Sequence, residues 1–564
     1  MGDLPIPSNG SSTRKRQYHD DVDSQRTTRP IYTERHIRVI CVGAGASGLL
    51  FAYKPQRSFS NFDLVIYEKN EQVGGTWWEN KYPGFPKLDW SGTYASSKEI
   101  FSYFDSFMDK YALQHYCRMR HQVRSAIWNT QEHGYHVKIR DLNTNTEIDD
   151  FCDILINAGG VLSSWRWSAI PGLESYKGTL VHTANWDESL VSSGIQVLPA
   201  ILPRVKGVTT FIREPTWVSP IPGLEQHIFT AEEKEAFATK PGLFTQYRKD
   251  IERGISSTFG VFLKNTQNQK ETREYMTQQM EDKLRGTNLE GVLIPQWSVG
   301  CRRITPGVSY LESLGTENVN VVYGNIDAVT PLGCVSGGRE YPVDVLICAT
   351  GFDTTFRPRF PIIGPKGNNL QDEWQNEPQS YFGIAAAGIP NYLMFLGPNS
   401  PVGNGPVLLA IEAQADYMMK LIDRYQTTNI ASFSPRPEAV ADFITYKNRF
   451  MHGTVWADAC QSWSKAGRPD GPITALWPGS TLHYIEVMDE VRTEDWETTY
   501  SGNRFDWLGN GYSQTECDET ADWAYYIRGK DDSEYHSRGK KRRIATKSGT
   551  VKADAGSLQV FPKI

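Results

Sequence analysis

Short apolar runs of strand length alternate with helical and irregular stretches along most of the chain. Five of these runs are rich in β-branched residues and lie at 37–42, 63–68, 153–157, 318–323 and 344–348. Each is short enough to form a buried strand. The charged stretch 230–290 and the stretch 406–425, with Leu409, Met418 and Ile422 on one face, predict helices. This alternation indicates an α/β fold.

The two ends of the chain differ from the part between them. Residues 1–35 are polar with mixed charges, and the chain turns polar and basic after Ile527. Both ends are therefore predicted to be disordered tails, 1–35 and 528–564. The basic run Lys540–Arg543 is either a solvated part of the tail or, alternatively, a nuclear address or a contact for an anion.

Composition excludes several classes of function. The 59 Lys and Arg residues against 65 Asp and Glu residues give a net charge of −6, so no basic field attracts nucleic acid. No apolar run approaches the roughly 18 residues of a membrane span, and the N-terminus lacks the apolar region of a signal peptide. We expect an intracellular, cytoplasmic protein without nucleic-acid or membrane partners.

The eight cysteines are scattered along the chain. They form no C-x-x-C pair and show no Cys/His spacing typical of zinc, so neither a dithiol redox site nor a metal site is expected. The cysteines are predicted to be free thiols.

A glycine-rich turn follows the first predicted strand and opens a helix. Gly43, Gly45 and Gly48 form a G-x-G-x-x-G motif, and Glu68 follows 20 residues later, at the end of the next strand. In this context the glycines allow a tight turn, a close approach to a pyrophosphate and close packing of helix on strand, while the acid accepts hydrogen bonds from a ribose. The motif predicts a dinucleotide site. Pro55 predicts that the helix ends or kinks near Lys54.

A second segment interleaves glycines and aromatic residues, from Gly74 through Thr76, Trp77 and Trp78 to Gly84. Ordinary core strands do not have this composition, and we interpret it as a surface shaped around a flat ligand. Together with the first motif, it resembles the G-G-T-W and Y-P-G segments of FAD-dependent class B monooxygenases.

The segment Tyr176–Asp187 makes the resemblance specific. It matches the Baeyer–Villiger fingerprint F-x-G-x-x-x-H-x-x-x-W-(P/D) through Gly178, His182 and Trp186, with Tyr176 in place of the first Phe. Residues 349–352, 397–405 and 477–484 agree with the family in order and spacing, the last with its fungal biosynthetic members. The chain is thus similar to Baeyer–Villiger monooxygenases over residues 36 to 527.

The resemblance implies an activity and its cofactors. In this family NADPH reduces FAD, the reduced flavin reacts with O₂, and oxygen is inserted beside a ketone carbonyl to give an ester or lactone. It implies a small-molecule ketone and O₂ as the substrates, in fungal secondary metabolism. In the fingerprint, His182 is expected to couple the two cofactor domains or to be a hydrogen-bonded structural histidine, and not to act as a base.

The resemblance also assigns residues to roles. Arg303 would stabilise negative charge beside the reduced flavin, as the catalytic residue, and Arg302 and Arg213 would bind the NADP 2′-phosphate. Ser193, Gly194 and Gln196 would also contact NADP. The residues expected to contact FAD are Gly43, Gly45, Ser47, Gly48, Glu68, Gly75, Thr76, Trp77, Trp78, Asn80, Tyr82 and Asn399.

The implied architecture is two Rossmann-like dinucleotide-binding domains with helical segments. The FAD domain would be discontinuous, with a first part at 36–170 and a second part with a C-terminal cap at 341–527. A linker and the NADP domain, with a helical insertion, would occupy 171–340 between them.

Two parts of the family pattern are missing. After Pro86 the chain lacks a segment that touches the flavin, and before Ser192 it lacks a strand and a glycine turn that cradle the NADP pyrophosphate. Loss of that strand is expected to expose its sheet neighbours and weaken nucleotide binding. A catalytically impaired FAD-binding homologue therefore stays an alternative. So does a flavin monooxygenase that hydroxylates N or S, although the fingerprint argues against it.

Overall fold

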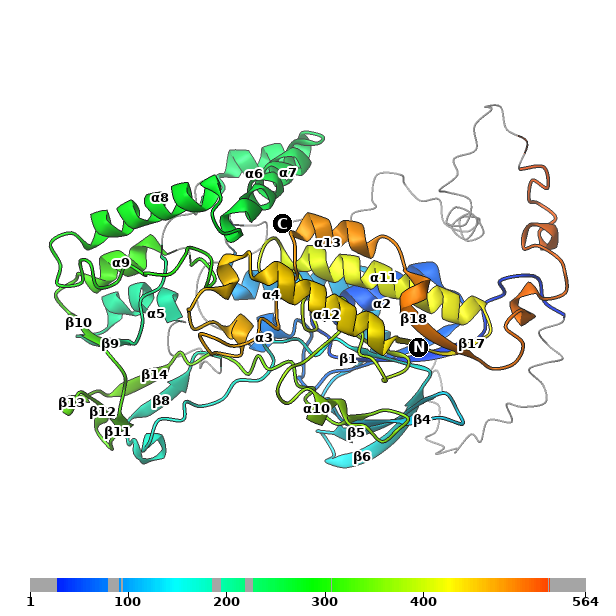
Figure 1. The fold of residues 1–564 in the computed structure, drawn as a ribbon, viewed down its shortest axis with the longest axis horizontal. Helices are drawn as coiled ribbons and strands as arrows, with labels where there is room; N and C mark the ends of the chain where they lie inside the picture. The colour runs from blue at the N-terminus through cyan, green and yellow to red at the C-terminus, as the bar shows by residue number, and fades with distance from the viewer. Residues whose placement is uncertain are drawn as a thin grey trace, which may run out of the picture.

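A computed structural model of the chain describes residues 28–79, 91–92, 95–184, 194–218, 227–305, 307–525 and 527. Its centre is a parallel five-stranded sheet with the order β16-β7-β1-β2-β3 (Figure 1). The strands are β1 (Ile37–Val42), β2 (Phe62–Tyr67), β3 (Cys117–Arg118), β7 (Ile154–Asn157) and β16 (Tyr392–Met394). Since β16 joins strands that end more than 200 residues earlier in the chain, the sheet is discontinuous in sequence, as predicted.

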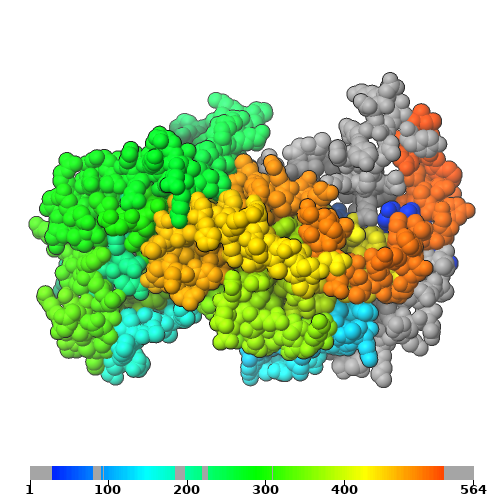
Figure 2. All heavy atoms as spheres, in the orientation of Figure 1, coloured from blue at the N-terminus to red at the C-terminus, as the bar shows by residue number. Residues whose placement is uncertain are grey.

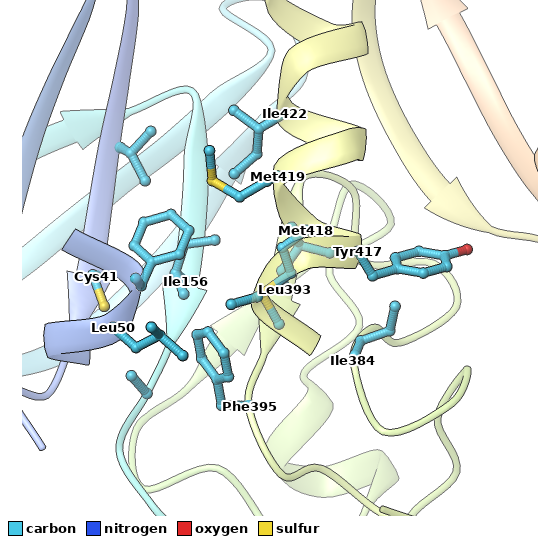
Figure 3. Packing of buried hydrophobic residues seen from close by; sticks show 14 of the residues in the cluster. Cys41, Leu50, Ile156, Ile384, Leu393, Phe395, Tyr417, Met418, Met419 and Ile422 are labelled. Carbon is cyan, nitrogen blue, oxygen red and sulfur yellow. The ribbon is translucent and has the colours of Figure 1, made fainter. Parts of the chain in front are cut away.

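Helices cover one face of this sheet and form the main core. The helices are α2 (Ala46–Ser58), α4 (Ser97–Lys110) and the long α11 (Val407–Thr427). Figure 3 shows Met418 and Met419 of α11 close to Leu50 of α2 and Ile156 of β7. Strands buried on both faces carry near-continuous apolar runs, which is why these strands could be recognised in the sequence.

The helix α2 does not end at Lys54, so the first of the two predicted alternatives, an end of the helix there, is wrong, while a kink stays a prediction. It continues through Pro55 to Ser58, and the Phe59 N–H donates to the Pro55 carbonyl at 2.8 Å. Pro55 has no N–H to donate to the Phe51 carbonyl, so α2 loses one hydrogen bond there, but its ring is buried in the core.

A second sheet packs on the other face. It contains the antiparallel strands β4 (His121–Asn129), β5 (Gly134–Asp141) and β6 (Thr146–Cys152), with β15 (Ile362–Ile363) parallel to β4. A second apolar cluster fills the space between the two sheets. α10 (Leu370–Glu373) lies beside this sheet (Figure 1).

The segment from β8 to β14 builds the opposite end of the molecule (Figure 1). It holds two parallel pairs, β8 (Thr179–His182) with β14 (Val345–Cys348), and β9 (Val208–Ile212) with β10 (Val319–Tyr323). Its helices and its antiparallel strands are α5 (Gly194–Ile201), α6 (Ala231–Thr239), α7 (Leu243–Ser256), α8 (Gln267–Leu284), α9 (Val308–Leu314), β11 (Ala328–Val329), β12 (Gly333–Ser336) and β13 (Arg339–Pro342).

The C-terminal segment returns to the first sheet and adds a cap. Its elements are β17 (Ile430–Pro435), α12 (Pro437–Met451), α13 (Thr481–Met488) and β18 (Trp496–Tyr500). In Figure 2 the yellow and orange residues of this segment lie directly against the green helical block. Phe262 packs with Trp456 there, in a small cluster of its own. Short 3₁₀ helices lie at Leu113–Tyr116, Leu173–Ser175, Leu202–Arg204, Ser257–Phe262, Val455–Ala457, Trp463–Lys465, Thr493–Asp495, Asp506–Leu508 and Thr515–Cys517.

The described residues confirm the predicted α/β class and add detail to it. All five predicted strands are present, shifted by at most one residue at either end. Residues 28–35, which were assigned to the N-terminal tail, are fixed by contacts such as Ile31 N–H to the Tyr512 carbonyl at 3.0 Å. The pairing of β14 with β8 forms a separate connection between the two ends of the molecule. The finer domain boundaries stay a prediction.

The prediction that every cysteine is free is wrong for two of the eight. Cys301 and Cys460 form a disulfide across 159 residues of sequence, with a Cα–Cα distance of 6.4 Å. The fold brings the loop before Arg302 against the C-terminal segment, a proximity that no local spacing shows. In the part of the chain that the structure describes, no helix is long and apolar enough to cross a membrane.

Candidate active site

The first glycine turn connects β1 to α2 in the predicted way. Gly43 has a φ of +102°, and a Cβ at this position would lie 2.7 Å from the Ala158 carbonyl oxygen. At Gly48, a Cβ would lie only 2.0 Å from the Gly43 carbonyl oxygen, so helix and strand pack too closely for any side chain. Gly45 is the N-cap of α2 and carries no side chain that could satisfy the first N–H groups. These groups form a site for a phosphate. Ser47 is buried in the first turn of α2.

Glu68 lies beside this turn, but it is already engaged by the backbone. Its Oε2 accepts from the Ala44 N–H at 2.7 Å, and its Oε1 accepts from the Asn70 N–H at 2.9 Å. Burial raises the pKa of Glu68, and the two N–H groups partly offset this. The carboxylate therefore ties the glycine turn to the end of β2, and a bond to ribose would use its remaining lone pairs.

The second glycine segment contacts the first. Gly75 has a φ of +53°, and a Cβ added to it would lie 3.0 Å from the Gly45 Cα. Two glycines thus face each other at the mouth of the turn. Thr76, Trp77 and Trp78 follow in the short helix α3 (Thr76–Glu79). The ring of Trp78 lies 5.3 Å from that of Phe101. Asn80 and Tyr82 lie outside the described residues.

Asn399 is completely buried and only partly satisfied. Its Nδ2 donates to the Leu476 carbonyl at 3.2 Å, whereas its Oδ1 has no partner. A buried amide oxygen without a donor is costly, and a ligand that donates a hydrogen bond would satisfy it. Together with the glycine cradle, this residue fits a dinucleotide cofactor that carries a hydrogen-bonding ring system.

The fingerprint segment forms part of the connection between the two ends of the molecule. A Cβ at Gly178 would lie 2.6 Å from the Asp344 carbonyl oxygen, so β8 can approach the turn before β14 only with glycine there. Tyr176, which replaces the Phe of the pattern, donates from its hydroxyl to the Val343 carbonyl at 2.8 Å. Both residues thus join β8 to β14. Trp186 lies outside the described residues.

His182 is buried at the end of β8. Its Nδ1 accepts from the Ala184 N–H at 3.1 Å, and its Nε2 lies 3.1 Å from the Thr350 hydroxyl. The ring of Trp165 stacks on it at 4.6 Å. Burial lowers the pKa of His182. Because Nδ1 accepts, the neutral ring carries its proton on Nε2, and this histidine holds β8 to the residue two positions after β14.

The predicted NADP arginines lie near the end of β9. Arg213 follows the last residue of β9 and is exposed. The guanidinium of Arg302 forms an ion pair with Glu214 and lies 4.7 Å from the centre of the Trp297 ring. The Nε of Arg302 and the Nε1 of Trp297 are buried donors without an acceptor. An anionic ligand would satisfy them, so the donor set fits a phosphate.

The remaining predicted contacts are less well placed. Arg303 is exposed, and its carbonyl accepts from the Thr305 hydroxyl at 3.4 Å. Gly194 begins α5, while Ser193 and the side chain of Gln196 lie outside the described residues. The structure thus brings the flavin residues of the first turn together and places Arg302 close to Arg213. Among the described residues, no hydrogen bond or ion pair of the Arg303 side chain is found.

The pair β9 and β10 is unusually exposed for parallel strands. Among the described residues these two strands pair only with each other, and no residue in either is fully buried. Tyr323, at the end of β10, is 50% exposed. The expectation that a missing strand leaves its sheet neighbours uncovered stays a prediction. The missing positions themselves fall in segments outside the described residues.

Comparisons with known proteins agree with this geometry. A family model for an NAD(P)-binding Rossmann-like domain matches residues 41–109. The FAD-binding monooxygenase tazF of Aspergillus terreus is 35% identical over 538 residues, covering 88% of this chain and 96% of tazF. The chain belongs to the FAD-binding monooxygenase family. A Baeyer–Villiger monooxygenase of Streptomyces coelicolor is 28% identical over 497 residues, covering 82% of this monooxygenase and 92% of that protein.

The solved structures give the fold of the monooxygenase. The crystal structure of cyclohexanone monooxygenase from Rhodococcus sp. Phi1 bound to NADP+ has a TM-score of 0.71 and 23% identity, covering 83% of this chain and all of that one. The resemblance drawn from the motifs is thereby confirmed, as is the α/β fold with two Rossmann-like domains.

Two features near the predicted NADP arginines were not predicted. One is Glu214, which directly follows Arg213 and forms an ion pair with Arg302, 88 residues away. The other is the disulfide of Cys301, next to Arg302. The adjacent opposite charges of Arg213 and Glu214 are the signal that could have drawn attention to the acid.

Proposed function

We propose that this chain converts a ketone to an ester or lactone, with NADPH and O₂ as co-substrates and FAD as the bound cofactor, in fungal secondary metabolism. FAD and NADPH are the cofactors of the family to which the chain belongs. When bound, the flavin supplies the activation of O₂. The residues of the chain bind the two nucleotides, exclude water and hold charge beside the reacting atoms.

The observation that carries the proposal is the folded fingerprint. Gly178, Tyr176 and His182 bind β8 to β14 and to the residues that follow it. These strands lie between the discontinuous sheet and the segment with the predicted NADP arginines (Figure 1). Both ring nitrogens of the buried His182 are engaged, Nδ1 by the Ala184 N–H and Nε2 by the Thr350 hydroxyl, which supports a coupling role over use as a base. The fingerprint favours ketone oxygenation over hydroxylation of N or S.

The proposed roles follow from the donors that are present. The turn at Gly43, Gly45 and Gly48, together with Gly75 and Asn399, would hold FAD. Arg302 and Arg213 would bind the phosphate of NADPH. Arg303, exposed in the loop after the disulfide, would supply positive charge beside the flavin. The cytoplasm is the proposed location.

One observation favours a second candidate, a homologue that keeps FAD but is impaired in NADPH use. It is the exposure of β9 and β10, because parallel strands normally have both faces covered. Such a protein would be yellow and would turn over slowly or not at all.

An anaerobic absorption spectrum distinguishes the two. The purified chain is expected to show flavin bands that bleach on addition of NADPH, and then to add one oxygen atom to ketones when air is admitted, detected by mass. Flavin bands that stay unchanged with NADPH would favour the impaired homologue. A colourless protein that does not take up added FAD would contradict both.

A further inference from the structure

The ion pair of Glu214 with Arg302 places an acid beside an arginine that is proposed to bind the 2′-phosphate of NADPH. Besides this pair, the Nη1 of Arg302 donates to the Pro215 carbonyl at 3.4 Å, and its face covers Trp297. The side chains of Arg302 and Glu214 are 20% and 35% exposed. The acid is thus partly sheltered and faces one of the two guanidinium groups that were assigned to the phosphate.

Glu214 lies just beyond the carboxyl end of a parallel strand. It lies two residues after Ile212, the last residue of a parallel strand that pairs in register with β10. In a dinucleotide-binding sheet, ligands bind beyond the carboxyl ends of the strands. An acid near this edge hydrogen-bonds the 2′-hydroxyl of NAD, whereas an arginine there accommodates the 2′-phosphate of NADP. Here both residue types are present, as Arg213 and Glu214.

The charges at this edge then determine which nucleotide binds more tightly. A carboxylate beside Arg302 neutralises it and repels an incoming phosphate. The same carboxylate can accept a hydrogen bond from a free ribose hydroxyl. We propose that Glu214 is a specificity-determining residue that lets this chain bind NAD(H) almost as well as NADP(H). This inference rests on the proposed function, because it takes Arg302 as part of the nucleotide site.

Binding of fragments tests the inference without turnover. The probes are 2′,5′-ADP, which carries the 2′-phosphate, and 5′-AMP, which lacks it, and their dissociation constants are measured by calorimetry on the full chain. The wild-type protein is expected to bind the two within about tenfold. Glu214→Gln should tighten 2′,5′-ADP by about tenfold, because it removes one repelling charge, and leave 5′-AMP unchanged or weaker. Glu214→Ala provides a second variant with the same expectation.

A matched control is Glu317→Gln, which removes an exposed acid two residues before the start of β10, at the other end of the β9–β10 pair from Glu214. It should change neither constant. Arg302→Ala should remove the gain of Glu214→Gln when the two are combined. The flavin-reduction rates with NADPH and NADH should shift in the same direction as the binding constants.

The outcomes separate this inference from the proposed function. An unchanged ratio of the two constants in both Glu214 variants would overturn the inference and leave the function intact. The same holds if neither probe binds while NADPH still bleaches the flavin. If neither probe binds and neither nucleotide reduces the flavin, the proposed function and the inference both fail.

Discussion

Removing the Cys301–Cys460 disulfide should weaken the junction between the helical block and the C-terminal segment. The bond closes a loop of 159 residues. In the chain-entropy description, a loop of that length restricts the unfolded chain by roughly 17 cal/mol/K, or about 5 kcal/mol at 25 °C. Measured values are generally smaller, about 2–4 kcal/mol. We expect Cys460→Ala to lower the unfolding midpoint in urea by the equivalent of about 2–5 kcal/mol.

The first measurement is a thiol titration in denaturant. Protein prepared without reductant should show six free thiols, and eight after reduction, as the described disulfide and free cysteines require. Urea unfolding then compares Cys460→Ala with Cys517→Ala, which removes an exposed free thiol and serves as the control. A reductant should lower the midpoint of the wild type and leave that of Cys460→Ala unchanged.

Eight reactive thiols before reduction would refute the reasoning. So would equal midpoints for the two cysteine variants. A lowered midpoint together with a slower flavin reduction would indicate that the disulfide also supports the position of Arg302, which directly follows Cys301.

Three further predictions address the core and the site. Gly48→Ala should lose bound flavin, measured by absorbance, because its Cβ would lie 2.0 Å from a backbone oxygen; Gly254→Ala, where no atom lies within 4 Å, should keep it. Lys447 is buried and donates to the Ile473 carbonyl at 2.9 Å, and burial lowers its pKa to about 8 from 10.5. Lys447→Met should therefore raise the unfolding free energy at pH 7 by at most about 3 kcal/mol, and this gain should shrink between pH 8 and 10.5. A lower unfolding free energy at pH 7 would disprove the prediction. Since the pKa of His182 is lowered from 6.5, the folded state loses stability as the pH falls below that value. Between pH 7.5 and pH 5, the unfolding free energy should fall less for His182→Gln than for the wild type. An equal fall in both proteins would contradict this.

Local features could be predicted from the sequence because their causes are local. The strands β1 and β7 are continuous apolar runs, and the turn at Gly43 needs glycine for a positive φ and close packing. The continuation of α2 through Pro55 was not predicted because it depends on the core in which the proline ring is buried. A proline in the sequence does not show this.

Contacts between distant segments could not be predicted in the same way. Glu214 and Arg302 are 88 residues apart, and Cys301 and Cys460 are 159 apart. Each pair exists because whole elements pack, namely β9 near the loop before α9 and the C-terminal segment against the helical block (Figure 2). The family resemblance pointed to Arg302, but it gave no information on the acid that neutralises it.

The strand pair β9–β10 lies next to the side chains on which the proposed nucleotide binding depends. One side of the β9–β10 pair packs against the cluster around Met280 and Leu311, and Phe211 contacts Tyr341 at 5.5 Å. No residue of either strand is fully buried, whereas parallel sheets normally have both faces covered. Under the proposed function, binding of the nucleotide at this edge depends on the positive charge of Arg213 and Arg302. Because Glu214 offsets part of that charge in its ion pair with Arg302, the proposal makes this acid the side chain that affects nucleotide choice.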